Sequence, residues 1–311
     1  MAGGRGFVGS HVVHALVGAG YRPVVFGPVM AEDRLASIAD RYDEICGSVD
    51  DRAALSQAFD TAKPAAVVSC VAHGAGRLGL MRSGEAEADA AVAVNVAGHG
   101  KLLDAAREAG VSKVVWTSST VVYGPASLYG AGPVDEEARC APVTFYGLTK
   151  TLAETLSAYH AQRYGLDVVG LRLPLILGPG LWYQGVASAI VEMFVAVREA
   201  TAAKIAFHDA LLDFMHVGDV AKAILTVLRQ PPGLSPVYNL EGFRASIPDL
   251  ITEIRRIKPG SQITFQKTEP AHLFPLIDGS RFRRTTGFTP DYDRAGLVSS
   301  LLDPEEEGVH V

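Results

Sequence analysis

Strand-like and helix-like stretches alternate along most of this 311-residue chain, and their order constrains the fold more than any other feature. Apolar runs of about four to eight residues have the length of buried strands, and apolar residues at helical spacing mark the helices between them. Alternation of this kind builds βαβ units, in which the strands run parallel and helices cover both faces. The sequence therefore predicts an α/β fold with a doubly wound parallel sheet.

The predicted elements occupy the first three quarters of the chain. The predicted strands are residues 23–26, 65–72, 114–118, 168–173 and 237–240. The predicted helices are residues 10–19, 51–59, 85–110, 146–164 and 217–229. The pattern changes after Pro174, where residues 175–207 read as an insertion, and the stretch 241–311 is mixed. We therefore expect a main domain of residues 1–174 plus 208–240 and a smaller one of residues 175–207 plus 241–311.

Glycines are concentrated where the chain enters its first predicted helix, in the run Gly3-Gly4-Arg5-Gly6-Phe7-Val8-Gly9. Glycines let the backbone turn tightly and let a pyrophosphate approach the helix N-terminus, where free N–H groups and the helix dipole attract anions. Taken alone, the run fits an ordinary turn equally well. With the βαβ order, it indicates a Rossmann domain that binds a dinucleotide.

The start of the chain does not match this interpretation. A Rossmann glycine loop follows the first strand of the sheet, but only Met1 and Ala2 precede Gly3. Two residues are too few for a central strand, and unpaired backbone at the sheet centre is costly. We interpret the start as truncated or misassigned. The first strand is then missing, its neighbours leave a gap or close over it, and the cofactor site is in doubt.

Tyr146 and Lys150 form a Tyr-x-x-x-Lys pattern, and their spacing places both on one helix face. A nearby ammonium stabilises the phenolate and lowers the tyrosine pKa from about 10. A phenol tuned in this way can pass a proton to or from a carbinol oxygen. The pattern alone is more typical of an exposed pair on an amphipathic helix. Ser119 lies just past the predicted strand 114–118.

Seven motifs occur in order along residues 3–290. They are the glycine loop, Asn95-Val96-Ala97-Gly98, Ser118-Ser119-Thr120-Val121-Val122-Tyr123-Gly124, Tyr146-Gly147-x-x-Lys150, Leu171-Arg172-Leu173-Pro174, Gly178-Pro179-Gly180 and Asp213-Phe214-Met215-His216-Val217-Gly218-Asp219-Val220-Ala221. Together they resemble the extended short-chain dehydrogenase/reductases, the NAD-dependent epimerase/dehydratase family.

The resemblance implies a role for each site residue. Ser119 would hold the substrate oxygen, and Tyr146 would be the general acid and base. Lys150 would hold the nicotinamide ribose and tune Tyr146, and Asn95 would complete the catalytic set. The cofactor would be NAD or NADP, which carries the hydride chemistry. The cofactor-binding residues would be Gly3, Arg5, Gly6, Phe7, Val8, Gly9, Asp50, Ala72, Lys150 and Pro174.

Departures from the family pattern narrow the chemistry. Thr120 and Val121 replace the acids that drive elimination in 4,6-dehydratases. Leu212 stands where many nucleotide-sugar enzymes carry a phosphate-binding arginine, and Pro174 stands where they often carry asparagine. Both changes weaken a nucleotide-sugar assignment. A substitute anion clamp could come from three C-terminal arginines that otherwise read as solvated charge: Arg281, Arg283 and Arg284.

Cofactor choice depends on the charge that follows the strand 23–26. A carboxylate there would bind the adenosine ribose and repel a 2′-phosphate. The next carboxylate in the chain is Glu32, and Arg5 lies within the glycine loop. We therefore expect NADP to be accepted, alongside or ahead of NAD. Ser48 replaces an aspartate common in relatives, and Asp50 or Asp51 can compensate.

Composition excludes several classes of function. A net charge of -6 argues against a nucleic-acid or anionic-membrane surface, and no apolar run approaches the roughly 20 residues of a membrane span. Cys46, Cys70 and Cys140 are scattered without metal or disulfide spacing, which suits a reducing cytoplasm. No metal site is expected.

The leading interpretation is an enzyme that oxidises or reduces a secondary alcohol or ketone of a sugar or nucleotide sugar, with epimerase ahead of other activities. One alternative is a simple dehydrogenase/reductase of a small hydroxy compound. An alternative of another class is a non-catalytic dinucleotide-binding protein. In the family, helices matching 85–110 and 146–164 pair as a four-helix interface, so the resemblance also implies a homodimer.

Overall fold

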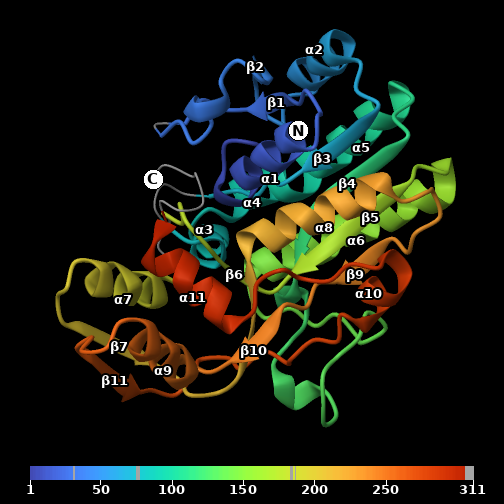
Figure 1. The fold of residues 1–311 in the computed structure, drawn as a ribbon. Helices are drawn as coiled ribbons and strands as arrows, with labels where there is room; N and C mark the ends of the chain where they lie inside the picture. The colour runs from blue at the N-terminus through green and yellow to red at the C-terminus, as the bar shows by residue number, and fades with distance from the viewer. Residues whose placement is uncertain (31, 75–77, 183–184, 186, 305–311) are drawn as a thin grey trace.

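The computed structural model describes residues 1–30, 32–74, 78–182, 185 and 187–304 (Figure 1). Its main sheet contains six named strands, all parallel. They are β1 (Val24–Gly27), β2 (Asp43–Cys46), β3 (Ala66–Ser69), β4 (Lys113–Ser119), β5 (Val168–Leu173) and β9 (Val237–Asn239). The pairs are β2 with β1, and then β3, β4, β5 and β9 in that order. The predicted parallel α/β sheet is confirmed.

Helices cover both faces of this sheet. The helices α1 (Phe7–Gly18) and α8 (Val217–Arg229) pack together on one face, and α2 (Arg52–Ala62), α5 (His99–Glu108) and α6 (Phe145–Tyr164) lie on the other. Because side chains alternate along a strand, β4 contributes to both cores. Val115 packs in the core formed with α1 and α8, whereas Val114 and Trp116 pack in the core formed with α2 and α5.

The central position of the sheet is occupied by Met1–Gly3, between β1 and β3. On one side, Ala2 N donates to Val68 O at 2.8 Å, and Cys70 N donates to Ala2 O at 3.0 Å. On the other side, Gly3 N donates to Phe26 O at 2.9 Å, and Phe26 N donates to Met1 O at 2.8 Å. The expectation of a gap or a closed sheet was therefore wrong. Very few residues suffice because both backbone groups of Ala2, and the Met1 carbonyl and Gly3 N–H, pair with the chain on either side.

The prediction of one continuous helix at residues 85–110 was also wrong. The helical segment starts earlier and divides into α3 (Leu80–Ala86), α4 (Ala88–Val92), a π-helical segment (Ala93–Gly98) and α5. Glu87 interrupts the helix with φ −133° and ψ 61°. Close packing explains the small residues here, since a Cβ on Gly84 would lie 3.1 Å from Tyr146 N and one on Gly98 would lie 2.8 Å from Val49 Cγ2.

A smaller set of elements gathers at one end of the molecule (Figure 1). The strands β6 (Leu175–Leu177), β8 (Leu212–His216) and β10 (Phe243–Ala245) form one sheet, and β7 (Ala203–Phe207) pairs with β11 (Ile263–Lys267). A separate core lies among α7 (Ser188–Arg198), α9 (Ile247–Ile257), α11 (Arg294–Leu302) and these strands. The helix α10 (Ser280–Thr286) lies against β9. The remaining short helices are 3-10 turns at Ala36–Ile38, Thr120–Val122 and Ala126–Leu128.

These elements bear on the proposed domain boundaries. Within the stretch 208–240, β8 pairs in the small sheet while α8 covers the main one. We keep the division into residues 1–174 plus 208–240 and residues 175–207 plus 241–311 as a proposal, with β8 as the connection between the two parts.

The first turn of α1 generates a stability prediction. A Cβ on Gly9 would lie 2.0 Å from Gly3 O, which is backbone that cannot move without disturbing the central strand position. Gly9→Ala is therefore expected to lower the free energy of unfolding by about 2 kcal/mol or more, as overpacking does. Chemical denaturation measures this change.

The matched control is Gly18→Ala, at the other end of the same helix. A Cβ there would meet nothing within 4 Å, so alanine should be neutral or slightly stabilising. Equal stabilities of the two variants would show that the glycine loop does not pack against α1 as described.

Candidate active site

The glycine loop follows the central strand position and leads into α1. Gly3 has φ +71°, a conformation that favours glycine, and Gly9 packs against the Gly3 carbonyl. Gly6 is the N-cap of α1 and has no side chain with which to cap the helix. A Cβ at Gly9 would fill part of the turn that the glycine loop forms. The loop therefore fits the pyrophosphate of a dinucleotide, with N–H groups and the helix dipole directed at the anion.

Arg5 in this loop is held by two carboxylates. Its Nε donates to Glu44 Oε1 at 2.7 Å, a second bond joins its Nη2 to Glu44 Oε2, and its Nη1 donates to Asp33 Oδ1 at 3.0 Å. The bond to Glu44 raises the pKa of Arg5 above its usual value. Sequence analysis missed this contact because β2, which carries Glu44, is a mostly exposed strand with no apolar run to reveal it.

Lys150 is buried on α6, with 3% of its surface exposed. Its Nζ donates to Thr117 O at 2.8 Å and to Val71 O at 3.3 Å, so it joins the ends of two strands. Burial lowers the pKa of Lys150 to about 8, and the nearby Cys70 and Glu154 oppose that change. The ammonium lies 5.7 Å from the centre of the Tyr146 ring. Tyr146 and Lys150 thus share one helix face, as their spacing predicts.

Tyr146 lies in the first turn of α6 and is buried. Two contacts fix this turn: Thr144 caps the helix by accepting from Gly147 N, and Glu85 Oε1 accepts from Phe145 N at 2.8 Å. The close approach of Gly84 to the Tyr146 backbone adds a third constraint. The position of the phenol is therefore determined by α3 as well as by α6.

Asn95 connects the loop after β3 to α6. Its Oδ1 accepts from His73 N at 2.7 Å, and its Nδ2 donates to Thr149 Oγ1 at 3.0 Å. The Thr149 hydroxyl in turn donates to Tyr146 O at 2.8 Å. Asn95 and Lys150 line one small cavity. Its remaining lining residues are Val49, Ser69, Val71, Val94, Gly98, His99, Leu102 and Trp116.

Ser119 is the last residue of β4, two positions beyond the carbonyl that holds Lys150. Its Oγ accepts from Val121 N at 3.4 Å. The other predicted cofactor residues also follow strands: Ala72 lies in the loop after β3, and Pro174 directly follows β5. Asp50 precedes α2, and its carbonyl accepts from Lys101. The carboxyl ends of parallel strands share one edge, where ligands of such sheets bind.

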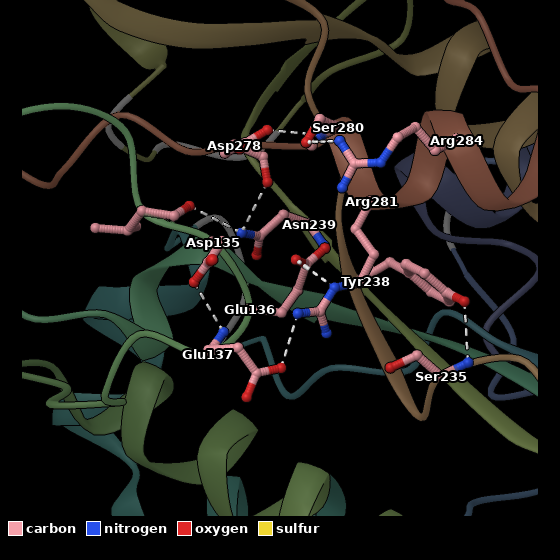
Figure 2. A network of polar contacts seen from close by, with 12 residues as sticks. Asp135, Glu136, Glu137, Ser235, Tyr238, Asn239, Asp278, Ser280, Arg281 and Arg284 are labelled. Carbon is pink, nitrogen blue, oxygen red and sulfur yellow. Dashed lines mark hydrogen bonds and ion pairs between the residues drawn. The ribbon is translucent and has the colours of Figure 1, made fainter.

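The three C-terminal arginines belong to α10, and Figure 2 shows two of them, Arg281 and Arg284. Arg281 pairs with Glu136 at 3.3 Å and with Glu137 at 2.7 Å, and Arg283 pairs with Glu241 at 2.8 Å. Arg284 is exposed and donates to Ser280 Oγ at 2.7 Å. The charges of Arg281 and Arg283 are therefore already compensated, and Arg284 is the better placed of the three to meet an anion.

The described residues contain no cluster of three or more His, Cys, Asp or Glu side chains that could hold a metal ion. Within the same residues, no helix combines the length and the apolar character needed to cross a membrane.

Comparison with known proteins places this geometry in a family. Residues 1–240 match the NAD dependent epimerase/dehydratase family. A UDP-glucose 4-epimerase of Rhizobium leguminosarum bv. trifolii is 28% identical, over 97% of this chain and 95% of that protein. The mitochondrial L-threonine 3-dehydrogenase of Bos taurus is 31% identical over 72% of this chain and 62% of its own length.

Solved structures share the fold. An L-threonine dehydrogenase from Cupriavidus necator, in its holo form, superposes with a TM-score of 0.86 at 22% identity, covering 98% of both chains. A Thermus thermophilus UDP-glucose 4-epimerase in complex with NAD gives a TM-score of 0.81 at 21% identity, covering 97% of this chain and 98% of that one. The chain belongs to the NAD-dependent epimerase/dehydratase family and is an NAD(P)-dependent enzyme of the extended short-chain dehydrogenase type.

Proposed function

We propose that this enzyme is a sugar epimerase that acts on a secondary alcohol of a nucleotide sugar. The observation that carries the proposal is the buried ammonium of Lys150 beside the ring of Tyr146. Both lie near the end of β4, whose last residue is Ser119. Similarity to a UDP-glucose 4-epimerase over nearly the whole chain supports the substrate class.

Each residue has a distinct task in this proposal. Tyr146 takes the proton of the substrate hydroxyl and returns it to the carbonyl oxygen, while the Ser119 hydroxyl holds that oxygen. Lys150 stabilises the phenolate electrostatically, and Asn95 fixes α6 against the loop after β3. A bound nicotinamide would supply the hydride acceptor and donor for the substrate carbon. Epimerisation requires that the sugar present its opposite face before the hydride returns.

The cofactor is assigned to the residues at the edge of the sheet. We propose that the pyrophosphate meets the first turn of α1 and that the remaining contacts come from the loops after β2, β3 and β5. These residues are Gly3, Arg5, Gly6, Phe7, Val8, Gly9, Asp50, Ala72, Lys150 and Pro174.

A simple dehydrogenase/reductase of a small hydroxy compound is the second candidate. Leu212 replaces the phosphate-binding arginine of many nucleotide-sugar enzymes, and the ion-paired Arg281 and Arg283 offer little substitute. The similarity to an L-threonine 3-dehydrogenase points the same way. A non-catalytic binding role has less support, because a pure binder has no use for a phenol beside a buried ammonium.

Turnover of Tyr146→Phe tests the proposed function. UDP-hexoses, L-threonine and hydroxy acids are assayed with NAD, for epimerisation by product analysis and for net oxidation by NADH absorbance. The wild type is expected to epimerise a UDP-hexose without net NADH formation. The phenylalanine variant should lose roughly 10²- to 10⁴-fold in kcat, because it lacks the acid and base.

Tyr164→Phe is the control, since Tyr164 is an exposed phenol at the far end of the same helix. Net NADH formation with L-threonine or a hydroxy acid would favour the second candidate. Equal turnover by wild type and Tyr146→Phe would contradict both.

We propose NAD rather than NADP as the preferred cofactor, which revises the expectation from sequence. That expectation rested on the absence of a carboxylate near the strand 23–26. The fold instead brings Asp33 and Glu44 onto Arg5, so the local charge is negative. A 2′-phosphate near this group would be repelled.

Dissociation constants for NADH and NADPH, measured by fluorescence titration, test this preference. NADH is expected to bind about tenfold more tightly, equivalent to ~1.4 kcal/mol. Glu44→Gln should bring the dissociation constants for NADH and NADPH closer together, because it frees Arg5. Asp43→Asn is the control and should not change their ratio, because the neighbouring Asp43 pairs with Arg22. Equal or tighter binding of NADPH by the wild type would overturn the assignment.

We also propose a homodimer. The outer face of α6 exposes Leu148, Leu152 and Tyr159 at helical spacing, and Val92 on α4 is also exposed. A second copy of the chain would remove this apolar surface from water.

The cysteines Cys46, Cys70 and Cys140 are free thiols, consistent with the proposed cytoplasmic location.

A further inference from the structure

A buried ion pair connects β5 to α6, the helix that carries the proposed catalytic residues Tyr146 and Lys150. Arg172 on β5 donates from Nε to Glu154 Oε1 at 2.9 Å and from Nη2 to Glu154 Oε2 at 2.7 Å. The exposed fractions of the two side chains are 4% and 12%. Such a bidentate pair is geometrically specific. Removing one partner is strongly destabilising, because it leaves the other as an unpaired buried charge.

Glu154 connects the two elements that carry the catalytic groups. Its Oε1 also accepts from Ser118 Oγ at 2.6 Å, and Ser118 directly precedes Ser119 on β4. On α6, Glu154 follows Lys150 by one helical turn. The Glu154 carboxylate therefore joins the end of β4 to α6, in addition to the contact of Lys150 with Thr117 O.

The pair is itself held from the other side. Arg172 Nη1 donates to Tyr123 Oη at 2.6 Å, and this phenol lies 2.9 Å from Asn239 Oδ1. Asn239 Nδ2 donates to Val134 O and Asp278 O, and Glu136 accepts from Asn239 N (Figure 2). The orientation of Arg172 is thus determined by a network that extends to the segment before α10.

We propose that Glu154 is a positioning residue of the acid–base centre, acting through Ser118 on the end of β4 and through its own charge on Lys150. This inference rests on the proposed function for the meaning of the centre, and it extends that function by one residue. Glu154 touches neither substrate nor cofactor in this role.

The charge component follows from the surroundings of Lys150. Two groups favour its protonated form, Glu154 on α6 and Cys70 after β3, and burial opposes them. On α5, His99 lines the same cavity, and burial, followed by the charge of Lys150, lowers the pKa of this imidazole to about 3. Burial raises the pKa of the Cys70 thiol to about 12, whereas the Glu154 carboxylate is ion-paired with Arg172.

The test is the titration of Lys150 itself, in protein without cofactor or substrate. Lysine labelled with ¹³C at Cε reports protonation by NMR, and Lys150→Arg identifies the resonance. In Glu154→Gln the titration midpoint of Lys150 is expected to fall by roughly 1 pH unit, as loss of a nearby opposite charge does. Glu154→Asp, which keeps the charge, should restore most of the difference.

Asp167→Asn is the matched control. Asp167 directly precedes β5 and pairs at 3.3 Å with Lys113, the first residue of β4; the exposed fractions of the two side chains are 11% and 6%. It removes a comparably buried carboxylate far from the centre and should leave the Lys150 midpoint unchanged. An unchanged midpoint in Glu154→Gln, or an equal movement in Asp167→Asn, would overturn the proposal.

Glu154→Gln leaves Arg172 buried without its partner and can fail to fold, so a second substitution removes that charge as well. The double variant Glu154→Gln/Arg172→Gln buries no unpaired charge, and it still removes the carboxylate that lies one helical turn from Lys150. Its midpoint should also fall, and an unchanged midpoint would again contradict the proposal. If no substrate turned over, the proposed function would fail while this titration still decided the role of Glu154.

Discussion

The contact between the Lys150 ammonium and two backbone carbonyls is the interaction on which the site depends. The carbonyls belong to Thr117 on β4 and to Val71 after β3, so one side chain ties α6 to the middle of the sheet. Burial makes this charge costly, and the protein offsets the cost with oriented carbonyls and a carboxylate one turn away. A charge held in this way does not need to reorganise when a phenolate forms beside it.

The same edge of the sheet receives the other parts of the site. Parallel strands bring their carboxyl ends together, which places the glycine loop, the end of β4 and the loops after β3 and β5 side by side. Asn95 and Glu154 then connect α6 to these loops from two directions. The buried network around Arg172 and Asn239 extends from this edge toward α10, so polar contacts connect the proposed substrate-binding part to α6.

Local patterns were sufficient to predict most of the main domain. Short apolar runs located β3, β4 and β5, and the spacing of Tyr146 and Lys150 placed both on one face of α6. The central strand position could not be predicted, because strand signals need length and Met1–Gly3 is held only by its neighbours. The contact of Glu44 with Arg5 spans 39 residues and involves an edge strand without an apolar pattern, so nothing local reveals it. The division of the helix at Glu87 depends on packing against α6, which is also long-range.

The most direct measurement is the pH dependence of stability in wild type and Lys150→Met. The pKa of Lys150 is lowered from 10.5 to about 8 in the folded chain, so between these values only the unfolded chain binds the proton. The free energy of unfolding of the wild type, relative to the methionine variant, should therefore rise by roughly 3 kcal/mol from pH 8 to 10.5. A difference that stays constant across this window would show that Lys150 is not a buried ammonium, and the account of the acid–base centre would be wrong.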